Sequence, residues 1–229
     1  MWMNLEPAIK KAREDFGRRD PQAMAVNAWV DLSPGGFQLS FLGEEYLIRY
    51  PQGEVGYLSR ENAAGGHSGP KQAAPENAAP EQTVPLTVPL PVQIILLHYL
   101  AQATPAAPEG RLISFKELPG GNIYVGPFAN RAIRPLLKYF GAAPEKLLAA
   151  GARFGVKPAG IGEFSVTVPA LPKIPVIFVL WPGDEEFPPS GNILFDSSAP
   201  KHLPAEDYVV LCGLVLDRLK EVKLTTERI

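Results

Sequence analysis

Apolar positions near the N-terminus recur every three or four residues, which predicts an amphipathic helix over Leu5–Phe16. A second, short helix is predicted from Pro21 to about Val26, because proline is favoured in the first helical turn. From Ala28 the hydrophobic period changes to two, and glycines separate the alternating runs. This pattern predicts an antiparallel β-meander, with strands expected near 28–32, 37–42, 45–50 and 54–58.

Helical periodicity returns further along the chain, together with a second group of strands. Helices are predicted at Pro91–Ala103, Phe128–Phe140, Pro144–Phe154 and Pro204–Val222. Pro135 predicts a kink or break near Arg131, because proline cannot donate the helical hydrogen bond. Extended segments are predicted at 115–118, 164–168, 175–181 and 193–196. The segregation of strands and helices predicts an α+β fold, in which the meander and the second strand group pack with about five helices.

Residues 61–90 differ in composition from the rest of the chain. Prolines recur in steps of about five, the run Ala-Ala-Pro-Glu occurs twice within the segment, and aromatic residues are absent from it. Such a composition cannot offset the entropy lost on ordering, so we predict a disordered, Pro/Ala-rich insertion. The expected organisation is an N-terminal helix with the meander (1–60), the insertion (61–90) and an α+β remainder (91–229) that forms one compact domain with 1–60.

Charge and cysteine content exclude several classes of function. The formal net charge is −2 and the basic residues are scattered, which argues against nucleic-acid binding. The longest apolar stretch, Ile174–Trp181, is too short to span a bilayer, and the N-terminus has no secretory signal pattern. We therefore expect a soluble cytoplasmic protein. The single cysteine, Cys212, cannot support a Cys-ligated iron–sulfur cluster and is expected to be a small buried hydrophobe.

The most unusual chemistry lies in the acid-rich segment 184–207. Its candidate metal ligands are Asp184, Glu185, Glu186, Asp196 and His202. Carboxylates are the donors that Mg²⁺ and Ca²⁺ prefer, and an added histidine would suit a transition metal. Asp184 and Asp196 could instead act as a general acid and base. The simplest interpretation is structural, because Pro-Gly-Asp is common turn chemistry and consecutive loop acids are usually solvated.

Other candidate sites receive less support from the sequence. His98 lies beside the apolar stripe of its predicted helix, and a hydrogen-bonded core histidine is favoured there over a ligand. The chain contains no G-x-S-x-G, H-E-x-x-H or C-x-x-C motif. Nucleophilic hydrolase, zincin and thioredoxin-type functions therefore lose their main support.

Five segments together resemble the domain of unknown function 3786 family. They are Gln93–Leu100, Ile113–Gly121, Val179–Phe187, Ile193–Ser198 and Leu203–Asp207. The resemblance covers roughly 5–58 and 88–222. It implies a protein of strictly anaerobic bacteria and archaea, some of whose relatives carry an added Cys-rich iron–sulfur domain akin to one in corrinoid iron–sulfur proteins. This chain departs from those relatives because Cys212 is its single cysteine.

Two functional hypotheses follow. The first is a non-catalytic accessory or small-molecule or cofactor-binding protein of anaerobic one-carbon or corrinoid-linked metabolism, with a protein partner or a corrinoid-type cofactor. The alternative is a metal-dependent enzyme that uses the acidic loop 184–207. The first is favoured, because the family context points to it and the sequence carries no catalytic signature.

Overall fold

The N-terminal helices pack on one face of the meander. The computed structural model describes residues 4–58 and 87–226. Helix α1 spans Glu6–Gly17 and α2 spans Pro21–Ala28, where the Asp20 carboxylate caps α2 by accepting the backbone N–H of Ala23 at 2.7 Å. Helix α2 extends two residues further than predicted, to Ala28, and the next residue, Trp29, ends it by adopting a left-handed conformation with φ 55°. The first strand therefore begins later than expected.

The predicted meander is confirmed as a four-stranded antiparallel sheet in the order β1-β2-β3-β4. Its strands are β1 (Asp31–Ser33), β2 (Gly36–Phe41), β3 (Glu44–Arg49) and β4 (Glu54–Tyr57). The alternation places Phe37, Leu39 and Phe41 on the buried face. The ring of Phe16 in α1 meets Phe37 edge to face at 5.5 Å between centroids, so α1 covers this face.

Helix α4 (Leu90–Gln102) joins the two halves of the fold. It contacts α1, α2 and α8 (Ala205–Thr226), and Ile95–Leu97 are completely buried. The hydroxyl of its Tyr99 donates to the carbonyl of Ala28 at 2.8 Å, which ties α4 to the end of α2. A helix that is apolar on nearly every side is expected at such a central position.

The second strand group forms a separate antiparallel sheet in the order β5-β9-β8-β7-β6. Its strands are β5 (Leu112–Ser114), β6 (Lys157–Pro158), β7 (Phe164–Leu171), β8 (Ile174–Trp181) and β9 (Ser190–Asp196). The expected extended segment at 115–118 is wrong, since Phe115–Glu117 is a 3₁₀ turn. The Glu117 carboxylate accepts the Ser114 N–H at 2.7 Å and ends β5 in a capping box.

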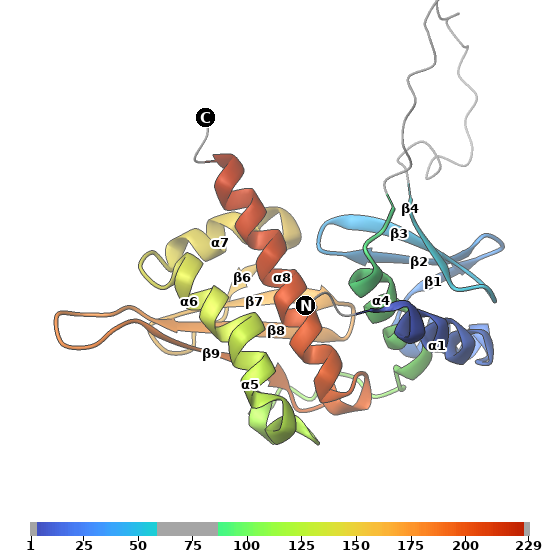
Figure 1. Cartoon of the computed structure of the whole chain (residues 1–229), viewed down its shortest axis with the longest axis horizontal. Coiled ribbons are helices and arrows are strands. Elements are labelled where there is room, and N and C mark those ends of the chain that lie inside the picture. Colours follow the sequence, from blue (N-terminus) through green and yellow to red (C-terminus); the bar gives the residue numbers. More distant parts are fainter. Residues whose placement is uncertain (1–3, 59–86, 227–229) are drawn as a thin grey trace, which may run out of the picture.

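A layer of helices covers one face of this second sheet (Figure 1). It contains α5 (Val125–Phe128), α6 (Arg134–Phe140), α7 (Glu145–Gly151) and α8. The break expected from Pro135 is confirmed, because a π-helical turn at Ala129–Ile133 separates α5 from α6. Pro135 has no backbone N–H to donate, and the first turn of an α-helix does not require one. The α-helix α6 can therefore begin around Pro135.

The architecture is the expected α+β fold. A continuous core of buried apolar side chains runs from Ile9 in α1 to Leu219 in α8, through both sheets. Most of the predicted insertion, 61–86, lies outside the described residues, and its last residue, Leu90, begins α4. Among the described residues, no helix combines the length and apolarity needed to cross a membrane.

Candidate functional site

The acid-rich segment begins in the loop between β8 and β9, at the end of a hairpin that projects from the molecule (at the left in Figure 1). Asp184, Glu185 and Glu186 are all exposed. The Asp184 carboxylate accepts the backbone N–H groups of Glu186 at 2.8 Å and Phe187 at 2.7 Å. These hydrogen bonds lower the pKa of Asp184. The carboxylate thus orders the loop, as in an Asx turn.

Phe187 is presented to solvent by this ordered loop. Its side chain is 67% exposed, and its carbonyl accepts the Asp184 N–H at 2.9 Å. Beside it, a hollow of about 420 Å³ lies between loop 182–189 and residues Gly141 and Ala142. The loop combines three acids with one large exposed aromatic ring on a fixed backbone.

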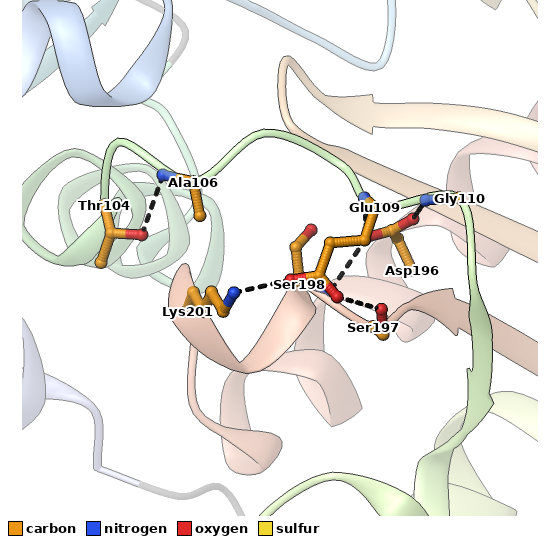
Figure 2. A network of polar contacts seen from close by, with 8 residues as sticks. All are labelled: Thr104, Ala106, Glu109, Gly110, Asp196, Ser197, Ser198 and Lys201. Atoms are coloured by element: carbon orange, nitrogen blue, oxygen red, sulfur yellow. Dashed lines mark hydrogen bonds and ion pairs between the residues drawn. The ribbon is translucent and has the colours of Figure 1, made fainter.

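Asp196 lies elsewhere, at the end of β9, and is 4% exposed. Figure 2 shows its carboxylate facing the loop that leads into β5. One oxygen accepts the N–H groups of Glu109 at 2.9 Å and Ser198 at 2.8 Å, and the other accepts that of Gly110 at 2.7 Å. Burial alone would raise the pKa of Asp196, but these amides and the Ser198 hydroxyl lower it overall. The charge is therefore already satisfied by the protein.

A second set of contacts reinforces this loop (Figure 2). The Ser197 hydroxyl donates to one oxygen of Glu109 at 2.6 Å, and the Lys201 ammonium donates to the other at 2.6 Å. The backbone N–H of Ser197 also donates to the carbonyl of Arg111 at 2.7 Å. The segment that follows β9 therefore fixes residues 109–111 through side chains and backbone together.

His202 follows the 3₁₀ turn Ala199–Lys201 and is 1% exposed. Neither ring nitrogen has a hydrogen-bond partner among the described residues. Burial lowers its pKa to about 4, assisted by the positive charges of Lys173 and Lys201. The imidazole is consequently neutral at physiological pH, with one donor and one acceptor unused inside the protein.

The structure does not bring the five predicted metal ligands together. Within 4–58 and 87–226, no group of three or more His, Cys, Asp or Glu side chains could hold a metal ion. Asp184 and Asp196 each use the carboxylate to bind backbone N–H groups. Loop 184–207 thus offers no shared coordination group within these ranges, and both N–H groups that bind Asp184 donate to its Oδ1.

Sequence reasoning missed Lys173, which lies in the tight turn between β7 and β8. It is 1% exposed, its Nζ donates to the Thr104 carbonyl at 2.8 Å, and Nζ lies 4.7 Å from the centroid of the Trp29 ring. Its backbone N–H donates to the Tyr99 hydroxyl at 3.2 Å. A lysine next to Pro172 in a hairpin turn is normally solvated, so no pattern in the sequence indicates this burial.

His98 is hydrogen-bonded, as predicted. Its Nδ1 lies 2.8 Å from Asp207 Oδ2, which links α4 to the first turn of α8. Burial would lower the pKa of His98, but the hydrogen bond and charge of Asp207, with Asp15 and Glu206 nearby, raise it overall. Cys212 is fully buried, which raises its pKa, and it behaves as the expected small hydrophobe.

Comparison with known protein families identifies the chain. A family model described as a domain of unknown function, DUF3786, matches residues 73–218, well over half of the sequence. The chain belongs to the DUF3786 family. The match covers α4, the second sheet and most of the helix layer, whereas the meander precedes it. Neither the curated proteins nor the solved structures contain a match to this DUF3786 chain.

The DUF3786 match contains the acid-rich loop, Asp196, His202, Lys173 and the pair formed by His98 and Asp207. His98, Asp196 and Asp207 come from three of the segments that carry the resemblance, and Asp184 comes from a fourth. His98 and Asp207 contact each other, and Asp196 lies close before α8. The loop 182–189 lies at the opposite end of β9.

Proposed function

We propose that this DUF3786 chain is a non-catalytic accessory protein that docks on a partner protein through loop 182–189. The supporting observation is Phe187, whose side chain is 67% exposed in the loop between β8 and β9. Figure 1 shows that this hairpin projects from the molecule. Large exposed aromatic residues are enriched in the centre of protein interfaces, where they fill pockets of the partner. Phe187 is the anchor in this proposal.

The order of the loop favours binding. The Asp184 carboxylate accepts a hydrogen bond from the backbone N–H of Phe187, and the Asp184 N–H donates to the Phe187 carbonyl. A loop that is ordered before binding loses less conformational entropy in the complex, so more of the contact energy appears as affinity.

The charge of the loop indicates the kind of partner. Asp184, Glu185 and Glu186 place three negative charges immediately before Phe187. Complementarity calls for a partner with an apolar pocket surrounded by lysine or arginine side chains, which would also speed association. The family resemblance suggests a partner in anaerobic one-carbon or corrinoid-linked metabolism, located in the cytoplasm.

A photo-crosslinking experiment tests the proposal. A photoreactive phenylalanine analogue at position 187 is expected to cross-link one basic protein in the source cells. The same analogue at Ile123, which is 78% exposed on another part of the surface, is the matched control. Equal cross-linking from both positions, or no cross-linking from position 187, would contradict docking through this loop.

Two variants then distinguish the contribution of the Phe187 ring to binding from that of the acidic side chains. Phe187→Ala should weaken binding to the identified partner by about 2 kcal/mol, mainly through faster dissociation. The double change Glu185→Gln with Glu186→Gln should slow association and reduce its salt dependence. Asp184 is left intact because it orders the loop. An unchanged affinity for Phe187→Ala in titration calorimetry would exclude Phe187 as the anchor.

The hypothesis that the chain binds a corrinoid-type cofactor has its own test. Cobalamin is titrated into the anaerobically purified chain and followed by UV–visible spectroscopy. A saturable shift of the corrinoid spectrum would favour a corrinoid-binding protein over a protein adaptor. An unshifted spectrum together with Phe187-dependent cross-linking is the result that the docking proposal predicts.

A further inference from the structure

A hollow of about 230 Å³ lies between the meander, the start of α4 and the C-terminal half of α8. Its lining includes the aromatic rings of Phe41, Tyr46 and Tyr57, and the centroid of the Tyr46 ring lies 6.4 Å from that of Phe41 and 5.2 Å from that of Tyr57. Val92 of α4 and Leu214 of α8 add aliphatic surface. Pockets for drug-sized ligands span about 300–1,000 Å³, so this hollow suits a smaller molecule with an apolar body.

Among the described residues that line the hollow, Arg218 is the basic one, and its guanidinium is already engaged. Its Nε donates to the Leu42 carbonyl at 3.4 Å, Nη1 donates to Glu221 at 3.4 Å, and Nη2 donates to Glu44. The central carbon of the guanidinium also lies 5.8 Å from the centroid of the Phe154 ring. An anionic ligand would therefore compete with two carboxylates and a carbonyl for this side chain.

Two carboxylates of the lining each keep one oxygen available to a ligand. Glu44 Oε1 accepts from Arg218, and Asp217 Oδ1 accepts from Lys220 Nζ at 2.9 Å. The second oxygen of each carboxylate has no hydrogen-bond partner within residues 4–58 and 87–226. The two side chains are 44% and 66% exposed, so a ligand can reach them from solvent. These residues thus offer negatively charged acceptors close to aromatic rings.

We propose that this hollow is a binding site for a small organic cation, a single ammonium group on an apolar body. The body lies against the rings of Tyr46 and Tyr57, and the ammonium lies beside the carboxylates of Glu44 and Asp217. Both kinds of neighbour stabilise an ammonium, because a cation is attracted to the face of an aromatic ring and donates charge-assisted hydrogen bonds to carboxylates. The site shares no residue with loop 182–189, so its failure would leave the docking proposal unaffected.

The test is a titration of the full-length protein with benzylammonium chloride, followed by NMR. The readouts are the methyl groups of Val92 and Leu214, assigned with Val92→Ile and Leu214→Met. These signals should shift saturably, with a dissociation constant of about 1 mM for a ligand of this size. Benzyl alcohol, which has the same shape without the charge, should bind more weakly, and benzoate should not shift the signals. Equal binding of either compound, or no saturable shift with benzylammonium, would overturn the proposal.

Variants at two neighbouring residues test the role of the carboxylates. Glu44→Gln removes one negative charge from the lining, so the dissociation constant of benzylammonium should rise about threefold or more. Asp217→Asn should weaken binding in the same way. Glu45→Gln is the matched control, because Glu45 is exposed and its side chain points to the opposite face of β3. An equal effect of Glu44→Gln and Glu45→Gln would show that binding reflects general surface charge and would contradict the site.

A variant that fills the hollow provides a test that does not depend on charge. Leu214→Trp adds an indole ring to the lining, so the Val92 methyl signals should no longer respond to benzylammonium. Val26→Trp is the control, because Val26 is 71% exposed and lies outside the lining. Undiminished binding by Leu214→Trp would place the cation elsewhere and overturn the proposal. Should Leu214→Trp fail to fold, Asp217→Asn still decides, because that side chain is 66% exposed.

Discussion

Hydrogen bonding from the backbone decides the role of each acidic side chain around β9. Asp196 is almost completely buried and still carries its charge, because amides of Glu109, Gly110 and Ser198 donate to it. Asp184 is exposed and uses the same kind of contact to order its own loop. His202 is buried without such contacts, and its charged form is consequently disfavoured.

Asp196→Asn should destabilise the protein. The substitution removes the negative charge that three backbone N–H groups share, so the free energy of unfolding should fall by about 2 kcal/mol. Urea unfolding at neutral pH measures the change, with Asp31→Asn on the exposed side of β1 as the control. A stability equal to that of the control would show that the network in Figure 2 contributes little.

His202 should make the protein sensitive to acid. Its folded pKa of about 4 lies below the ordinary value of 6.5, so the unfolded chain binds the proton more readily. The stability is fully present above pH 6.5 and falls as the pH drops toward 4, by about 3 kcal/mol in total. Urea midpoints across this range should fall more steeply for the unmodified protein than for His202→Leu. Parallel pH profiles would contradict the burial of an unpaired imidazole.

At the scale of elements, the hydrophobic period predicts most of the fold. The meander, β7–β9, α4 and α8 all lie where the pattern places them, because each has a long apolar face. The boundaries of α2 and β5 differ from expectation, since a left-handed Trp29 and the Ser114–Glu117 capping box end them. Such contacts depend on side chains that the periodicity does not include.

The contact between α4 and α8 should respond to pH in the opposite direction to His202. The pKa of His98 is raised above 6.5, chiefly by Asp207, so the stabilisation is fully present below 6.5 and is lost as the pH rises through the folded pKa. Asp207→Asn removes that charge. An NMR titration should then show His98 losing its proton at a lower pH than in the unmodified protein, and an unchanged titration would contradict the pairing.

Which polar residues meet could be predicted only in part. The acid-rich loop was recognisable from its composition, and its role as turn chemistry was among the interpretations that the sequence left open. The contact of Lys173 with Thr104 and Trp29 was not predictable, because it depends on how three distant segments meet beyond the end of α4. A contact between segments far apart in the chain produces no periodic pattern in the sequence.

At the scale of the whole molecule, two antiparallel sheets share one core through α4, and one hairpin extends from that core. In the docking proposal, the ordered loop of this hairpin enters a partner and loses little conformational entropy on binding.

The most direct test of the accessory role is anaerobic purification of the tagged chain from its own cells, followed by mass spectrometry and metal analysis. We predict a co-purifying protein at constant stoichiometry that is lost with Phe187→Ala and retained with Ile123→Ala. A chain that purifies alone, with stoichiometric metal that disappears on Asp184→Ala and Asp196→Ala, would contradict the account and restore the metal-dependent enzyme.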